Sequence, residues 1–463
     1  MHERNGQQNG HSALMTPAGL TRDILGRHQE TGNLYRLALG VFGVLLILGV
    51  IGFIMRLGDG INNPRFWGYY AAMFSFILTT AMAAPMVAIV PRMAKGHWRR
   101  GISRPAELFA VVGLFNLLVF IPLLWVLPPL SDGRRSLWFW HEGEVPVFSP
   151  HIWASVALGA LVLTGLALLY LSSLPDFAAI RDTATGRRKR IYGRLALGWL
   201  GTSKQWNMLY HRMGMTGSFY FMLLITVHFL IAVDFAMALV PGWIDALYPA
   251  THEANSLQAG VATVMLAMFF MARFGPYKRY IGLDQFWGLG KLMFALSLLW
   301  FWFWFSSFIV LWYGSKPSQE AVLELLMVGP YLPAFRAAFV LLFIVPMFTM
   351  MWNRVRRSLW GPPLLATSVL IGSFFDRIRI YVPAYQVAAD EDKHELQAIP
   401  VANMPDVADV FIMLGIIGGS IFVYLLATKV IPAVNLWEQK ELLLYSVHKR
   451  FHRTEVHVMG KPD

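Results

Sequence analysis

The sequence predicts an all-α integral membrane protein with about ten transmembrane helices. Of its 463 residues, 56% are hydrophobic and only 14% are charged, and the mean hydropathy is +0.50. A soluble globular domain carries about 25% charged residues. Because one span needs about 20 apolar residues, this composition fills roughly ten spans and leaves no room for a large soluble domain.

Long apolar runs mark the predicted spans in order along the chain. They cover residues 37–55, 66–90, 106–127, 151–173, 212–240, 256–273, 286–312, 334–353, 362–383 and 407–428. The segment before them, residues 1–33, is polar and lacks the apolar centre of a cleavable signal peptide. We therefore expect a cytoplasmic tail there. An even number of spans places both termini on the same side.

Positive charge is concentrated in alternate loops. The loops after spans 2, 4, 6 and 8, together with Arg273 at the end of span 6, carry 18 Lys and Arg residues, whereas the loops after spans 1, 3, 5, 7 and 9 carry six. Cytoplasmic loops are the ones enriched in Lys and Arg. We expect a multi-pass protein of the bacterial inner membrane with both termini cytoplasmic. The net charge of +12 then reports orientation in the lipid bilayer and does not indicate nucleic-acid binding.

The chain contains no cysteine, which limits its redox chemistry. It cannot ligate an iron–sulfur cluster, attach a c-type haem or use a thiol. His151, His211 and His228 are the histidines in or beside predicted spans, and they lie at the outer edge, the inner edge and the centre. A bis-histidine haem needs two imidazoles at one depth, so we predict no haem, and we predict no metal site because no ligand spacing is present.

The fifth predicted span carries His228 near the membrane centre and Asp234 roughly 9 Å closer to the outer surface, at 1.5 Å per residue. Six residues turn the helix by about 600°, so the two side chains do not share a face. Ionisable groups at this depth are costly and are often functional. The alternatives are a proton-relay or ligand role and a hydrogen bond that packs helices.

The ninth predicted span carries Asp376, Arg377 and Arg379, where an unpaired arginine would be costly. We expect an interhelical ion pair from Arg377 to Asp234 or to Asp409. This pair is either part of a polar route or purely architectural.

Three further positions are candidates near the membrane surfaces. Glu107 and Lys291 have similar heights on the inner side, so they are expected to pair or to form the inner end of a polar path, unless Lys291 snorkels to the interface. His151 opens the fourth span at the outer surface, close to Trp153. An imidazole at that depth can accept a proton from a quinol, although an interfacial histidine without a role is the alternative.

Several segments carry a resemblance to a known family. They are Leu174–Asp182 (LPDFAAIRD), Ile191–Trp199 (IYGRLALGW), Val227–Trp243, Leu289–Lys291 and Trp312–Gly314. Together they resemble the polysulfide reductase membrane-subunit (NrfD-like) superfamily over roughly residues 100–385. The resemblance is closest to the ten-helix quinol-oxidising membrane subunit of alternative complex III.

The resemblance implies two four-helix bundles with two peripheral helices. The expected division is a cytoplasmic polar tail at 1–33, peripheral helix 1 at 34–60, a first bundle on the quinone side at 61–240, a second bundle at 241–385, an outer loop with helix 10 at 386–432, and a cytoplasmic basic tail at 433–463. His228 and Asp234 match family residues of a proposed proton route. Glu107, Lys291 and the Asp376–Arg377 pair are similar to family acidic and basic positions.

The resemblance also implies a substrate and partners. Family members exchange electrons between membrane quinol, either menaquinol or ubiquinol, and a periplasmic iron–sulfur subunit of the ferredoxin-like or molybdopterin type. Cytochrome c subunits and a second related membrane subunit are the other expected partners. The chain would then be a quinone-interacting subunit of a respiratory or photosynthetic oxidoreductase, with a proton-conducting subunit or a non-redox anchor as alternatives.

The sequence departs from the family at the expected quinol site. The outer end of the third span, residues 124–129, has no histidine, and Ala154 stands where the family has an acidic residue. His151 lies three residues earlier, nearly one helical turn, and would present an imidazole on a similar face. We therefore expect His151 to replace the family residue, with Trp153 beside the quinone.

Overall fold

The computed structural model describes residues 16–127, 151–388, 396, 398–451 and 454–459. Within them the chain is almost entirely helical, which confirms the predicted all-α membrane fold. Eight helical stretches in the described residues are long and apolar enough to cross a membrane. They are Asn33–Gly58, Ser103–Val126, His151–Thr183, Ser203–Leu239, Tyr248–Arg273, Leu283–Gly314, Leu332–Met350 and Val407–Val430.

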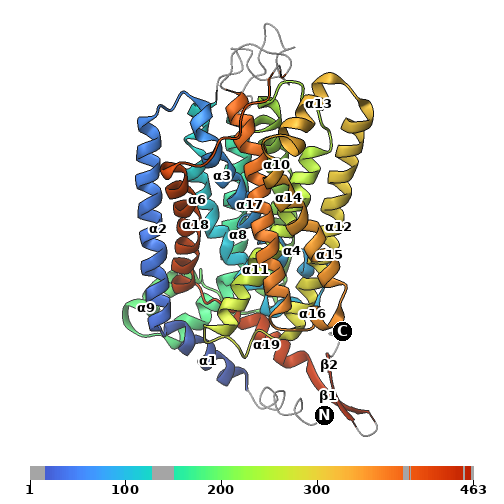
Figure 1. The fold of residues 1–463 in the computed structure, drawn as a ribbon. Helices are drawn as coiled ribbons and strands as arrows, with labels where there is room; N and C mark the ends of the chain where they lie inside the picture. The colour runs from blue at the N-terminus through green and yellow to red at the C-terminus, as the bar shows by residue number, and fades with distance from the viewer. Residues whose placement is uncertain (1–15, 128–150, 389–395, 397, 452–453, 460–463) are drawn as a thin grey trace.

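Two of the ten predicted spans are helical but fall outside this set. The second is interrupted, because α3 (Gly68–Thr80) ends before a turn that carries Pro85 and α4 (Met86–Met93) begins after it. The ninth is α17 (Gly361–Val387), which is long enough but more polar than the others. Figure 1 shows α17 running beside the other long helices through the height of the molecule.

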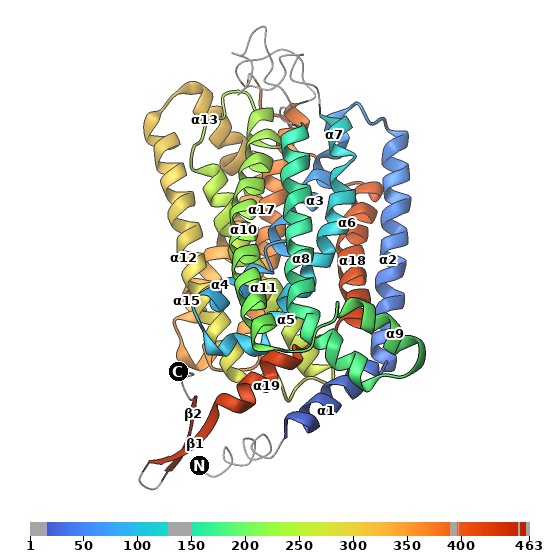
Figure 2. The same ribbon diagram turned by 180° about the vertical axis from the view of Figure 1, so that it is seen from behind.

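The long helices form one bundle with distinct flanks (Figures 1 and 2). α2 (Asn33–Gly58) and α18 (Val407–Val430) lie at one flank, and α12 (Leu283–Gly314) lies at the other. The remaining membrane helices, including the broken ones, lie between them. Besides α3, α4 and α17, these are α5 (Ser103–Glu107), α6 (Val112–Phe120), α7 (Leu123–Val126), α8 (His151–Thr183), α10 (Ser203–Asp234), α11 (Tyr248–Arg273), α14 (Leu332–Phe339) and α15 (Val345–Met350).

The first and last helices lie at the same end of this bundle. α1 (Pro17–Gln29), α9 (Gly186–Leu195), α16 (Asn353–Arg356) and α19 (Leu436–Tyr445) are at the lower end of Figure 1, and α13 (Pro317–Leu323) is at the upper end. We call these the terminal end and the opposite end. The predicted basic tail contains α19 and an antiparallel hairpin of β1 (Ser446–Phe451) and β2 (Thr454–Met459), which sequence analysis did not anticipate.

Short helical turns connect the long helices. They are the 3-10 turns Pro64–Trp67, His97–Gly101, Leu108–Val111 and Met237–Leu239, and the π-helical turns Glu324–Val328 and Val340–Ile344.

Helix α11 begins eight residues before the sixth predicted span. It starts at Tyr248, with Pro249 in its first turn, where a missing N–H costs nothing. Its first residues are polar yet buried, including Thr251, His252 and Asn255. This early start adds two turns of polar side chains to the interior of the bundle.

Candidate functional site: buried polar networks

Two buried histidines lie between neighbouring helices. His228 on α10 is fully buried and His252 on α11 is 1% exposed, and their Nδ1 atoms are 2.8 Å apart. A hydrogen bond needs one donor, so one imidazole donates through Nδ1–H and the other accepts. Two imidazole nitrogens that ligate one tetrahedral zinc at about 2.0–2.1 Å lie about 3.3 Å apart, so the shorter spacing here fits a hydrogen bond better than a shared ion.

Other polar groups extend this histidine pair in both directions. His252 Nε2 lies 3.1 Å from Ser75 Oγ on α3 and 3.2 Å from Tyr381 Oη on α17. His228 Nε2 lies 3.7 Å from Glu253 Oε2. Side chains from four helices therefore form a polar chain in the interior, which is hydrogen-bonded except at the 3.7 Å contact between His228 and Glu253. Each imidazole can take a proton at one nitrogen and release one at the other, which is the chemistry of a relay.

A charged cluster on α17 lies next to this chain. Asp376 accepts hydrogen bonds from Arg377 at 2.6 Å and from Arg379 at 2.9 Å. Arg377 also donates to Asn255 Oδ1 at 3.0 Å, and Asn255 donates to Ser373 Oγ at 3.1 Å. The carboxylate is thus held by two guanidinium groups, one of which reaches α11.

The prediction that Arg377 pairs with Asp234 or Asp409 was wrong. Arg377 pairs with its neighbour Asp376, as the sequence places them side by side, and not with Asp234 or Asp409. Asp409 instead lies 2.7 Å from Arg56 on α2. The physical reason is that α18 packs against α2 at the flank of the bundle, so Asp409 faces α2 and is separated from α17.

A cavity of about 30 Å³ separates the charged cluster from α12 and α13. Its polar lining includes His252, Asp245, Asp376, Arg377 and Arg379. This volume exceeds what one water molecule needs, and the lining supplies several hydrogen-bonding groups for it. The histidine pair and the α17 cluster are therefore joined by a space that a water molecule fits.

A second network lies at the terminal end. Glu107 Oε1 accepts from Arg92 at 2.6 Å, and Glu107 Oε2 accepts from Ser172 at 2.5 Å. The expected pair between Glu107 and Lys291 is not formed. Lys291 Nζ lies 3.8 Å from the ring centre of Trp287, so this lysine is held at an aromatic face, where a cation is attracted.

Helix α19 closes this network from the terminal end. Glu438 is fully buried and accepts from Arg99 at 2.5 Å and from Arg92 at 3.2 Å. Burial raises the pKa of the Glu438 carboxyl, but the Arg99 and Arg92 guanidinium groups outweigh it and hold the pKa below its ordinary value. Trp437 fixes the helix by donating to the Ser172 carbonyl at 3.0 Å.

One more buried ion pair completes the terminal-end network. Arg104 donates to Asp176 at 2.8 Å and to the Ser172 carbonyl at 2.9 Å, and both charged side chains are fully buried. Asp176 belongs to the LPDFAAIRD segment that carried the resemblance. Its role in this structure is to anchor α8 to α5.

The predicted quinone residues lie at the opposite end. His151 is the first residue of α8, and its ring centre is 6.0 Å from that of Phe235, the residue after α10. The ring centre of Phe235 lies 5.3 Å from that of Phe120, and these two rings form an aromatic wall. Asp234 is buried beside Phe235.

Trp153, the other predicted quinone residue, is 42% exposed. It lies two residues after His151 on the same helix and so faces a different direction, and Trp153 and His151 do not line one wall. Residues 128–150 before α8 lie outside the described part.

The comparison with known families decides what kind of protein this is. Residues 59–389 match the family described as polysulphide reductase, NrfD. The chain belongs to the NrfD family. NrfD membership implies a membrane subunit of a quinone-interacting oxidoreductase complex with iron–sulfur or molybdopterin subunits. No curated protein matches the chain significantly.

Some of the buried charged residues lie outside the range matched by the NrfD family. It covers α3 to α17, which hold the histidine pair and the α17 cluster, and ends before α18 and α19. Asp409 and Glu438 therefore reach the bundle from beyond the matched range. Within the described residues no group of three or more His, Asp or Glu side chains is arranged to hold a metal ion.

Sequence reasoning missed half of the histidine pair. His228 was a candidate, whereas His252 and Glu253 were assigned to a loop because the polar run Thr251–Ser256 lowers the local hydropathy. A usable signal was present. His252, Asn255 and Ala259 recur at helical spacing after Pro249, which marks a helix start with a buried polar face.

Proposed function

We propose that this NrfD subunit oxidises or reduces membrane quinone and passes protons through its buried polar chain. The carrying observation is the His228–His252 pair, which joins α10 and α11 in the membrane interior through Nδ1 atoms 2.8 Å apart. The complex would resemble alternative complex III in the bacterial inner membrane. A periplasmic iron–sulfur subunit would dock at the opposite end, and cytochrome c subunits and a second related membrane subunit would complete it.

The quinone would bind where His151 approaches the end of α10. An imidazole beside the Phe120–Phe235 wall offers a hydrogen-bonding group and aromatic surface, which suits a quinone ring. Quinol oxidation releases two protons and two electrons. The His151 imidazole would take the proton of one quinol hydroxyl, the other hydroxyl would release its proton to water, and the two electrons would pass to the partner, since this chain has no cysteine to hold a cluster. Trp153 would face the lipid from which quinol arrives.

Turnover of the purified complex with a quinol analogue tests the quinone site. We expect His151→Ala to lower the rate about 100-fold or more, the usual contribution of a general base. Ile152→Ala is the matched control, because this neighbour is 51% exposed. An unchanged rate in His151→Ala would remove His151 from the reaction.

The second function, proton transfer through the histidine pair, needs a readout that a packing role would not change. In proteoliposomes we expect His252→Gln to reduce the number of protons moved per quinol while turnover continues. Ser297→Ala is the control, since it removes a buried hydrogen bond to Gln258 away from the pair. Equal proton yields in both variants would favour a structural role. If neither His151→Ala nor His252→Gln changes any readout, the chain acts as a non-redox anchor.

A further inference from the structure

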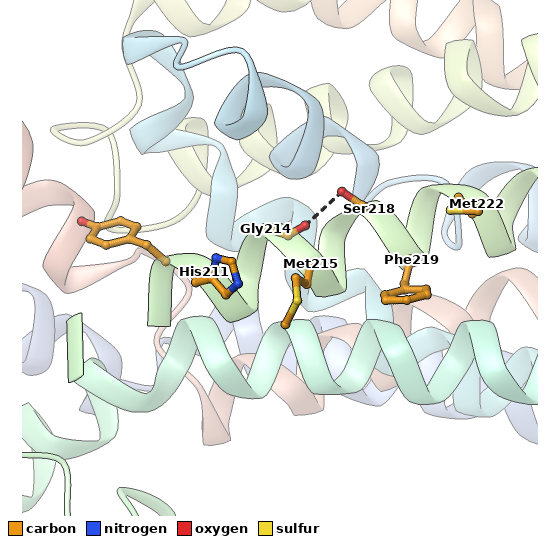
Figure 3. Close-up of a pocket in the computed structure, with 7 residues that line it drawn as sticks. His211, Gly214, Met215, Ser218, Phe219 and Met222 are labelled. Atoms are coloured by element: carbon orange, nitrogen blue, oxygen red, sulfur yellow. Dashed lines mark hydrogen bonds between the residues drawn. The ribbon is translucent and has the colours of Figure 1, made fainter. Parts of the chain in front are cut away.

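A groove of about 420 Å³ runs along the surface of α10 in its terminal half, and Figure 3 shows the side chains that line it. It is lined by Tyr210, His211, Gly214, Met215, Ser218, Phe219 and Met222. Gly214 creates the hollow, because a side chain there would meet no atom within 4 Å. Ser218 donates its hydroxyl to the Gly214 carbonyl at 3.1 Å, so the middle of the groove presents mostly apolar surface.

The same face of α10 becomes basic and polar toward the terminal end. Lys204, Asn207 and His211 follow one another at spacings of three and four residues, which aligns them on one side of a helix. All three side chains are exposed. From Tyr210 to Met222 the groove extends roughly 18 Å, comparable with one leaflet of the hydrocarbon core. The face therefore has a cationic head region followed by an apolar trough.

The chain before α10 adds to the positive charge. Residues 183–233 contain no Asp or Glu, and they carry Arg187, Arg188, Lys189, Arg190, Arg194, Lys204 and Arg212. The carboxylate of Glu441, on α19 at this end, is paired with Arg100 at 3.0 Å. An excess of positive charge beside an apolar trough is complementary to an anion that carries a hydrocarbon chain.

Two exposed leucines mark this segment as a surface that meets lipid. Leu197 and Leu200 are 73% and 78% exposed. Leu197 has φ +43° and Gly198 has φ +69°, so consecutive residues are left-handed. A leucine rarely adopts this conformation, and here it turns the side chain outward beside the basic helix α9. Such apolar side chains next to cations are typical of membrane-surface elements.

We infer that this face of α10 binds one anionic phospholipid. Its phosphate pairs with Lys204 and His211, and an acyl chain fills the trough over Gly214 between Met215 and Met222. The charge of Lys204 favours a phospholipid over a quinone, because a quinone has no negatively charged group that could pair with this lysine. The site is independent of the function proposed for the buried networks.

Native mass spectrometry of the full chain tests this site after reconstitution in vesicles of equal phosphatidylglycerol and phosphatidylethanolamine with identical acyl chains. We expect the purified protein to retain phosphatidylglycerol preferentially. Lys204→Gln should lower its retention about five-fold, the effect of one basic residue at a lipid surface. Gly214→Leu should displace the lipid by filling the trough, whereas Gly40→Leu should not, since Gly40 on α2 also has open space around it.

Three results of the lipid-retention experiments would overturn the inference. They are equal retention of the two lipids, retention that survives Gly214→Leu, and release of a quinone instead of a phospholipid from the trough. Inorganic phosphate at millimolar concentration should not displace the lipid, because the acyl chain contributes to binding; displacement by phosphate alone would also contradict the site. Lys204 is exposed, so Lys204→Gln keeps the test valid if Gly214→Leu fails to fold.

Discussion

Buried arginines in this protein are each held by a carboxylate. Arg56 contacts Asp409, Arg104 contacts Asp176, and Arg377 contacts Asp376, with N–O distances between 2.6 and 2.8 Å. An unpaired charge inside a membrane protein costs at least a few kcal/mol, so removing one partner is far more damaging than replacing both. The Arg56–Asp409 pair joins α2 to α18 and the Arg104–Asp176 pair joins α5 to α8. Arg377 and Asp376 are neighbours on α17, and Arg377 reaches α11 by donating to Asn255.

His28 should make the docking of α1 sensitive to pH. Burial, with help from the Arg188 and Lys429 charges, lowers its pKa from 6.5 to about 4. The folded state therefore binds a proton less readily than the unfolded state. Above about pH 6.5 the titration of His28 does not change the free energy of unfolding. As the pH falls from about 6.5 to about 4, the free energy of unfolding decreases by about 3 kcal/mol, and below pH 4 this loss is constant.

Limited proteolysis within residues 17–29 measures this effect. We expect faster cleavage at pH 5 than at pH 7 in the wild type, and no such difference in His28→Leu, which keeps a buried side chain without a titratable group. A pH response that persists in His28→Leu would assign it to another residue.

Glu438→Gln should destabilise the terminal end. The neutral amide leaves Arg92 and Arg99 with less negative charge in a buried site, and breaking such a network costs about 3 kcal/mol. Thermal unfolding measures the loss. Glu441→Gln is the control on the same helix, because its side chain is 21% exposed and its pair with Arg100 is less buried than the fully buried Glu438 carboxylate. Equal shifts in the two variants would contradict the role given to Glu438.

The helices differ in how well their positions can be predicted from the sequence. Apolar runs located α2, α8, α10 and α18, because each is apolar over most of its length. The start of α11 was missed because its buried face is polar, and its burial depends on hydrogen bonds to α3 and α17 that lie far away in the chain. Hydropathy measures contact with lipid, so it cannot report a polar face that is satisfied by other helices.

Contact between α2 and α18 depends on two glycines. A Cβ added to Gly415 would lie 2.1 Å from the Gly49 Cα, so the backbones touch at this crossing. We expect Gly415→Ala to push the helices apart and to cost about 1–3 kcal/mol, as overpacking does. Gly40→Ala on α2 is the control, because its Cβ would meet nothing within 4 Å. Thermal unfolding in detergent should separate the two variants, and an equal effect would contradict a close crossing.

Some features of the whole molecule could be predicted from the sequence and others could not. The all-α membrane fold was predictable from composition, and α1 and α19 lie at one end, as an even number of spans requires. The pairing of Asp409 with Arg56 and of Glu438 with Arg92 was not predictable, because α18 and α19 return to α2 and α4 across more than 300 residues. Only the three-dimensional neighbours of each helix decide such pairs.

Orientation in the membrane can be measured directly because the chain has no native cysteine. Arg354 lies on α16 at the terminal end, Lys316 lies at the opposite end before α13, and both are exposed. Since positive loops stay in the cytoplasm, we expect Lys316→Cys to react with a membrane-impermeant maleimide in intact cells. Arg354→Cys should react only in inverted vesicles. The reverse pattern would place the iron–sulfur partner at the terminal end and would move the proposed quinone site at His151 to the cytoplasmic side.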